Sequence, residues 1–81
     1  MNKKKQIIPL TKLLKGEKAK FLSFEGELLM QKRLHDIGLT KNTQISVISR
    51  GIFGDPIAIR THNIRIAIGK KEAAKIKVEC I

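Results

Sequence analysis

The sequence predicts an all-β fold: a small closed barrel of about five short strands, with one short helix inserted after the first strand. Three observations support this fold class. The chain has 81 residues, which is enough for one domain with a thin core. Short segments in which apolar and polar residues alternate are typical of half-buried strands. Only one stretch, residues 26–39, changes to the period of a helix.

The first predicted strand is Lys18–Phe24. Its alternation places Ala19 and Phe21 on one face and Leu22 and Phe24 on the other. The segment before it begins with a short extended stretch at Ile7 and Ile8. Three leucines that follow are expected to cover one end of the core: Leu10, Leu13 and Leu14.

The predicted helix has one apolar stripe. Met30, Leu34 and Ile37 fall at positions i, i+4 and i+7, so they lie on one face, with Leu34 as its central anchor. Gly38 follows where a left-handed residue would end the helix, and Leu39 is then expected to fold back onto the stripe. Leu34, Ile37 and Gly38 are therefore the predicted structural residues.

Further strands are expected after the helix. A turn at residues 40–43 uses Asn42, a residue type that tolerates positive φ. The strands then follow over residues 43–50, Ile57–Thr61, Ile64–Ile68 and 76–81. Residues 69–75 are expected to form a helical turn at most. The predicted core comprises Phe21, Leu34, Ile37, Ile45, Val47, Ile59, Ile66 and Val78.

The register of the hairpin between residues 57 and 68 follows from its pattern. A two-residue turn at His62-Asn63 pairs Ile59 with Ile66 and makes one face almost entirely isoleucine. A slip of one residue would mix isoleucine with arginine on both faces. The favoured register places Arg60 opposite Arg65, which is destabilising unless an acidic group lies nearby.

The segment Gly54-Asp55-Pro56 interrupts this regular pattern. Glycine followed by proline is expected to bend the chain, because a small barrel requires sharp bends and Pro56 has no N–H for the ladder. Asp55 is expected to set the turn by accepting hydrogen bonds from nearby backbone N–H groups.

The strong positive charge suggests an anionic partner. Seventeen Lys and Arg residues against seven Asp and Glu residues give a formal charge of +10. A solvated surface that happens to be rich in lysine would explain the same composition. Trp and Tyr are absent, so nucleic acid is the less favoured partner, because such proteins often stack bases on aromatic side chains.

The sequence contains no pattern that indicates catalysis or a metal site. It lacks a phosphate-binding loop, a nucleophile elbow and a zinc-protease motif. His35 and Asp36 are adjacent on the helix, so their side chains diverge by ~100°. No two of His35, Asp36, His62 and Cys80 have a ligand spacing, and we expect no metal and no cofactor. The N-terminus does not resemble a secretory signal, and no apolar run is long enough for a membrane helix.

Several segments together resemble the ferrous iron transport protein A (FeoA) family. They are "LLKGEKAKF", "LHDIGL", "TKNTQISVISR", "GDPIAIR" and "IRIAIGKKEAAKIKV", and they extend from Leu10 to Val78. The most specific is Gly54-Asp55-Pro56-Ile57. Asn42 stands where the family commonly has glycine. The resemblance implies that residues 7–81 form one FeoA-type SH3-like domain. Residues 1–6 are polar, and we expect them to form a flexible, basic N-terminus outside the family pattern.

The resemblance also implies a function. It suggests a non-enzymatic cytoplasmic accessory to a membrane ferrous-iron transporter with a GTPase domain (FeoB type). The alternative is a stand-alone regulatory or nucleic-acid-binding module, related to the SH3-like domain of metal-responsive repressors. Transition-metal binding is connected with the family only by association, and no ligand residues can be assigned here.

A docking site is predicted around the Gly54-Asp55-Pro56 bend. Ile52 and Phe53 before it form an apolar pair on a segment expected to be exposed. Arg50, Arg60 and Arg65 are expected at the rim, facing an acidic partner surface. Basic residues elsewhere, including Lys3-Lys4-Lys5, would attract the chain to the anionic inner face of the cell membrane. If this surface does not bind, the Lys32–Arg33 side of the helix is the next candidate.

Overall fold

The computed structural model describes residues 6–81. Except for Gln6, the predicted flexible segment 1–6 lies outside these residues. The strands are β1 (Ile7–Pro9), β2 (Lys18–Phe24), β3 (Gln44–Arg50), β4 (Ile57–Thr61), β5 (Ile64–Ile68) and β6 (Ile76–Cys80). The helical segments are η1 (Leu10–Lys12), α1 (Leu28–Asp36), η2 (Ile52–Gly54) and α2 (Lys70–Ala73).

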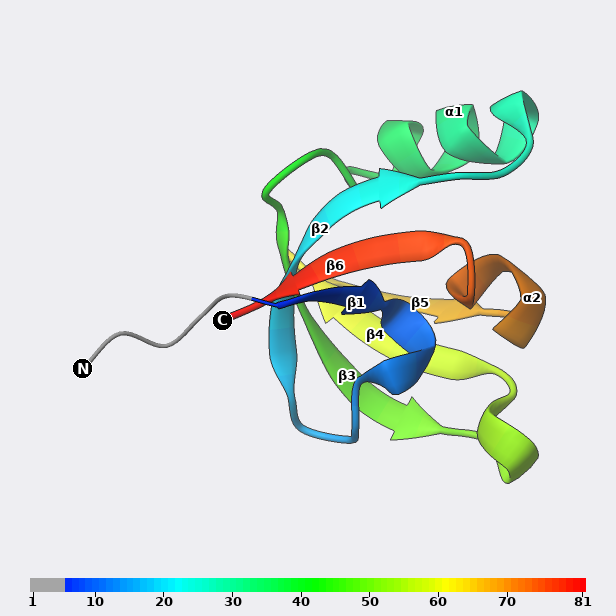
Figure 1. The fold of residues 1–81 in the computed structure, drawn as a ribbon. Coiled ribbons are helices and arrows are strands. Elements are labelled where there is room, and N and C mark those ends of the chain that lie inside the picture. The colour runs from blue at the N-terminus through cyan, green and yellow to red at the C-terminus, as the bar shows by residue number, and fades with distance from the viewer. Residues whose placement is uncertain (1–5) are drawn as a thin grey trace.

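The strands form one antiparallel sheet that curls around the core (Figure 1). Its strand order is β1-β6-β2-β3-β4-β5. β1 and β5 are the edge strands of this order, so strand pairing alone does not close the barrel. Instead, α2 follows β5 directly and contacts η1, which follows β1. The two helical segments thereby connect the open edges.

The described strands number six, one more than the approximate number predicted. The additional strand is β1, which the sequence indicated only as a short extended stretch. Ile8 of β1 pairs with Val78 of β6. Because β1 has only three residues, its alternation is too short to indicate a strand without this partner.

The strands bend at two β-bulges. The ladder of β2 with β6 shifts between Phe21 and Ser23, and that of β3 with β4 shifts between Val47 and Ser49. Such shifts sharpen the local bend of a strand. We predicted that the Gly54–Pro56 segment would supply such a bend. It instead belongs to the loop between β3 and β4. The first bulge also returns Phe24 to the core face, where the alternation had not placed it.

The core lies inside the curled sheet. Its buried apolar side chains are Leu10, Leu13, Ala19, Phe21, Phe24, Leu34, Leu39, Ile45, Val47, Ile57, Ile59, Ile68, Ala73, Ile76 and Val78. Of the predicted core residues, Ile66 is only half-buried and packs against this cluster. Ile37 is 39% exposed, so its prediction as a core residue is wrong. Leu14, expected over one end of the core, is exposed as well.

The end of α1 explains why Ile37 leaves the core. Gly38 has a φ of +102°, and its N–H donates to the His35 carbonyl at 3.0 Å. The N–H of Leu39 donates to the Leu34 carbonyl at 2.9 Å. These two bonds make a Schellman motif, which reverses the chain and buries Leu39 against Leu34. Leu39 thus takes the core position that the stripe assigned to Ile37.

The β4–β5 hairpin has the predicted register. Ile59 pairs with Ile66 and Arg60 with Arg65. His62 in the turn has a φ of +52°. Its ring also lies against the end of α1, because a Cβ on Gly38 would lie 3.3 Å from the Cδ2 atom of His62.

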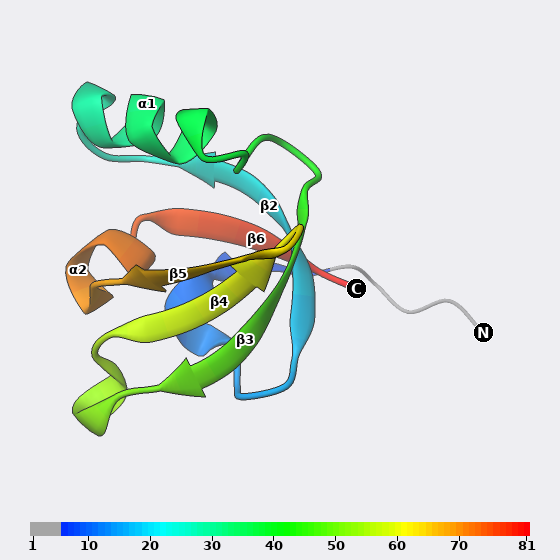
Figure 2. The same ribbon diagram turned by 180° about the vertical axis from the view of Figure 1, so that it is seen from behind.

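The two ends of the barrel carry different elements. One end, opposite the two chain termini, carries α2, η2 and the first turn of α1 (Figures 1 and 2). The β4–β5 hairpin turn lies toward the end where the termini emerge (Figure 2). The predicted site residues are therefore distributed over two regions.

Candidate functional site

The loop between β3 and β4, residues 51–56, forms a compact turn, here called the docking loop. The N–H of Gly51 donates to the Pro56 carbonyl at 2.8 Å, and that of Gly54 donates to the Gly51 carbonyl at 2.9 Å. A Cβ on Gly51 would lie 2.3 Å from the Asp55 carbonyl oxygen. The two sides of the loop can approach this closely only because residue 51 has no side chain.

The docking loop presents two apolar side chains to solvent. Ile52 is 80% exposed and Phe53 is 89% exposed, as the sequence led us to expect. Phe53 has a φ of +59° and a ψ of +25°, in the left-handed region. A bulky residue rarely adopts this conformation, and such outliers are common at functional sites. The loop therefore holds a large aromatic ring outward at a local conformational cost.

Contacts with α2 support the docking loop from one side. An Asp55 carboxylate oxygen accepts a hydrogen bond from the N–H of Lys70 at 3.0 Å, and Lys70 Nζ donates to the Phe53 carbonyl at 3.3 Å. Asp55 was expected to bond within its own turn, but this partner lies fifteen residues later. Beside this junction is an open hollow of about 520 Å³, lined by Asp55, Gly69, Lys70, Lys71, Glu72 and Ala74.

Arg50 supports the docking loop from the other side. Its guanidinium Nη1 donates to the Thr11 carbonyl at 3.0 Å and to the Leu13 carbonyl. The side chain is half-buried, and its Nη2 would lie 3.1 Å from a Cβ on Gly54. Arg50 therefore joins the chain around η1 to the docking loop. It is not the solvent-facing rim cation that was predicted.

The other two predicted rim arginines are not close to the docking loop. Arg60 and Arg65 are exposed and face each other across β4 and β5. Arg60 lies three residues beyond Ile57, where β4 leaves the docking loop, and strand geometry makes this about 10 Å. The predicted single site therefore separates into an apolar loop and a distant arginine pair.

A second apolar feature at the same end was not predicted. Leu28 and Leu29, in the first turn of α1, are 78% and 63% exposed. A hollow of about 210 Å³ between α1 and α2 is lined by Phe24, Glu27, Leu29, Met30, Arg33, Glu72 and Lys75. Glu72 lines this hollow and also the one beside Asp55. Two consecutive leucines outside the Met30–Leu34 stripe were the signal that could have indicated this feature.

We call this region, comprising the docking loop, α2 and the first turn of α1, the docking end. It combines exposed apolar side chains with charged ones around shallow hollows. Across residues 6–81, no three His, Cys, Asp or Glu side chains are grouped so that they could hold a metal ion. None of the helices in the described part is long and apolar enough to cross a membrane.

Comparison with known families identifies this fold. The FeoA domain family matches residues 8–80, nearly the whole chain. The chain belongs to the FeoA family. A solved member of that family is described as an SH3 domain protein, so the predicted SH3-like fold is confirmed. Ferrous iron transport is named in the description of a curated relative.

One curated relative is a fusion protein. It is the Fe(2+) transport protein A/Fe(2+) transporter FeoB fusion protein of Porphyromonas gingivalis. This FeoA chain is 29% identical to it over 72 residues. The match covers 89% of this chain but only 8% of the fusion protein.

Solved structures show the same fold. The FeoA protein of Chlorobium tepidum has a TM-score of 0.86 and 27% identity, with 91% of this chain and 70% of that chain covered. A manganese-dependent transcriptional repressor has a TM-score of 0.84, with 98% of this chain and 44% of that chain covered. Its identity is 16%, so this likeness concerns the fold alone.

Proposed function

We propose that this chain is a non-enzymatic accessory module for ferrous iron uptake that binds the cytoplasmic part of a FeoB-type membrane transporter. The observation that carries the proposal is the Porphyromonas gingivalis protein, in which a FeoA sequence and a FeoB sequence form one chain. Domains that are fused in one organism commonly associate as separate chains in another. The module would then work in the cytoplasm, at the inner face of the membrane when it is bound.

The docking end is the surface that this association would use. Ile52 and Phe53 are mostly exposed, as are Leu28 and Leu29 at the same end, and exposed apolar side chains that gather in one region are typical of interaction sites. The docking loop is held by its own hydrogen bonds, by Lys70 and by Arg50. Little conformational entropy is therefore lost when a partner covers it, which favours binding.

The proposal can be tested with the purified chain and the cytoplasmic region of a FeoB-type transporter. Phe53→Ala is expected to weaken their association about tenfold or more, because aromatic side chains at the centre of an interface contribute most to affinity. The measurement is calorimetric titration of the two proteins. Thermal melting of the variant should match that of the parent, since the Phe53 side chain is almost fully exposed.

A matched control is available on the helix. Lys32→Ala removes an exposed side chain outside the docking end and should leave the affinity within about twofold. Equal affinity for the parent and Phe53→Ala would exclude the docking loop as the contact. If Lys32→Ala alone weakened binding, the predicted Lys32–Arg33 side of α1 would be the interface instead.

The second candidate is a stand-alone regulatory or nucleic-acid-binding module. Two observations favour it: the formal charge of +10 and the shared fold of the manganese-dependent repressor. Salt dependence separates the candidates. A nucleic-acid complex weakens steeply as salt increases, because each neutralised phosphate releases counterions. A protein complex with an apolar centre weakens much less.

A further inference from the structure

Four outward-facing residues form a row across β2, β3, β4 and β5. Lys18 pairs with Ser46, Ser46 with Arg60, and Arg60 with Arg65. Directly paired residues of antiparallel strands point to the same face, so all four side chains lie on the outside of the sheet. Their neighbours along each strand, such as Ala19 and Ile59, are buried in the core. We call these four residues the cationic row.

The cationic row contains like charges that lie close together. Arg60 and Arg65 face each other directly, and one serine separates Arg60 from Lys18. The carboxylate nearest in sequence is Glu17, and it accepts a hydrogen bond from the N–H of Leu14 at 2.7 Å in its own turn. Like charges opposite one another are unfavourable in a sheet unless an anion lies between them.

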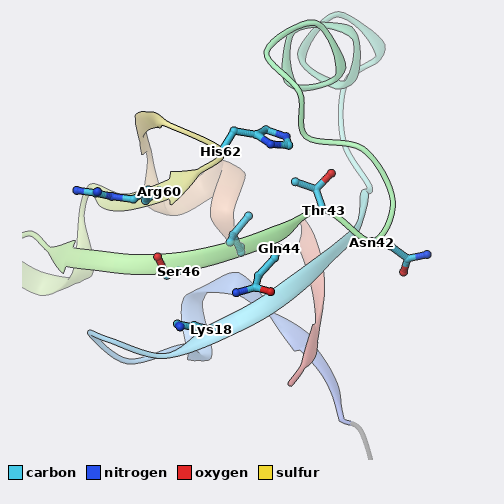
Figure 3. A pocket seen from close by; sticks show the side chains of 8 residues that line it. Lys18, Asn42, Thr43, Gln44, Ser46, Arg60 and His62 are labelled. Atoms are coloured by element: carbon cyan, nitrogen blue, oxygen red, sulfur yellow. The ribbon is translucent and has the colours of Figure 1, made fainter.

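A hollow of about 520 Å³ adjoins the cationic row (Figure 3). It is lined by Lys18, Asn42, Thr43, Gln44, Ile45, Ser46, Arg60 and His62. Figure 3 shows Lys18 and Arg60 on either side of Ser46, with Gln44 and His62 farther along the strands. Among the described residues that line this hollow, none carries a carboxylate. Its polar groups include hydroxyl, amide and cationic donors.

We infer that the cationic row and its hollow bind an acidic peptide segment of a protein partner, in extended conformation. Four strands at about 4.8 Å spacing make the row about 14 Å long. Acidic residues at alternate positions of an extended peptide are about 7 Å apart, so three of them also span about 14 Å. A single small anion would contact only part of the row. Among the residues that line the hollow, none is Phe, Tyr or Trp, and His62 is the single ring on which a base could stack, which favours a peptide over a nucleic acid.

This inference does not depend on the transporter proposal. The docking loop lies before β4, whereas Arg60 lies near the hairpin turn at its far end. The row also involves Lys18 and Ser46, which the docking end does not. A peptide could therefore bind the row whether or not the docking end contacts a transporter.

The test is an NMR titration of the isotope-labelled chain with a capped peptide of three glutamates separated by serines. About 0.1 M salt screens charges that lie more than about 10 Å from the peptide. Amide shifts are expected to concentrate at the cationic row and hollow. The double substitution Lys18→Gln with Arg60→Gln should weaken binding roughly fivefold or more, because two exposed ion pairs are lost. A peptide with glutamines in place of the glutamates should not bind.

The matched control is Lys32→Gln with Arg33→Gln, which removes one lysine and one arginine from the exposed face of α1. It should keep the peptide affinity within about twofold, although the net charge falls equally. In contrast, Ser46→Glu places a carboxylate within the cationic row and should abolish binding of the peptide. Thermal melting checks that each variant is folded.

Three results would overturn the inference. An equal loss of peptide affinity in the two double variants would mean that the net charge of the chain alone attracts the peptide. Inorganic phosphate that shifts the same amides at the same concentration would indicate a small-anion site. A single-stranded oligonucleotide of equal charge that binds the row more tightly than the peptide would indicate a nucleic-acid groove.

Discussion

At the scale of single residues, burial separates two neighbours that look equivalent in the sequence. Leu34 and Ile37 both fall on the apolar stripe predicted from the sequence, but Leu34 is 2% exposed, whereas Ile37, directly after α1, is 39% exposed. The difference arises at Gly38, whose left-handed conformation directs Leu39 into the core. Their contributions to stability should therefore differ.

Leu34→Ala is expected to lower the free energy of unfolding by roughly 2–5 kcal/mol, because it leaves a cavity in the core. In a domain of this size each kcal/mol lowers the melting temperature by about 4–8 °C. Thermal unfolding followed by circular dichroism measures the effect. Ile37→Ala is the control and should cost less than about 1 kcal/mol. Similar melting of the two variants would show that α1 does not pack through Leu34.

At the scale of elements, the docking loop is a shaped connection rather than a flexible link. Its conformation combines a close approach at Gly51, left-handed residues at Phe53 and Gly54, and support from Lys70 of α2. The contact at Gly51 involves backbone atoms on both sides, which cannot move aside as a side-chain end could. The loop and the end of β3 should therefore respond together to a change at Gly51.

Gly51→Ala is expected to destabilise the chain by about 1–3 kcal/mol, in the range of overpacking substitutions, because its Cβ would overlap the Asp55 carbonyl. Chemical denaturation measures this change. The same variant should weaken binding to the FeoB-type cytoplasmic region, since Phe53 is displaced. Ile52→Ala, on the adjacent exposed residue, should leave stability within about 0.5 kcal/mol. A fully stable Gly51→Ala variant would show that the loop has another accessible conformation.

At the scale of the whole molecule, the curled sheet separates an apolar surface from a cationic one. The docking end groups the docking loop with α2 and the start of α1 (Figure 1). The cationic row crosses the outer face from β2 to β5, with Arg60 and Arg65 nearer the hairpin turn. The SH3-like fold thus provides two surfaces that share no residue.

The two surfaces are expected to bind independently. Substitutions that are well separated and share no partner usually have additive effects. Phe53→Ala should therefore leave the affinity for the acidic peptide within about twofold, and Lys18→Gln with Arg60→Gln should leave the apolar contact of the docking end unchanged at high salt. The same titrations measure both effects. Strong coupling between the variants would mean that one partner covers both surfaces.

The sequence alone determined the features that depend on local periodicity and on single special residues. The register of β4 with β5 followed because only one pairing gathers the isoleucines on one face. The end of α1 followed from Gly38, since a left-handed position favours glycine. The exposure of Ile52 and Phe53 was also predicted, from their place next to the Gly54-Asp55-Pro56 turn.

Only the tertiary structure decided the features that depend on partners distant in the chain. Phe24 faces the core because of a bulge in the pairing of β2 with β6, which no alternation within β2 indicates. Arg50 bonds carbonyls 39 and 37 residues earlier, so it is a structural arginine and not a rim cation. The cationic row exists because strand pairing brings Lys18 into line with Arg60. Local pattern specifies which way a side chain points, whereas its neighbours across the sheet are specified only when the strands pair.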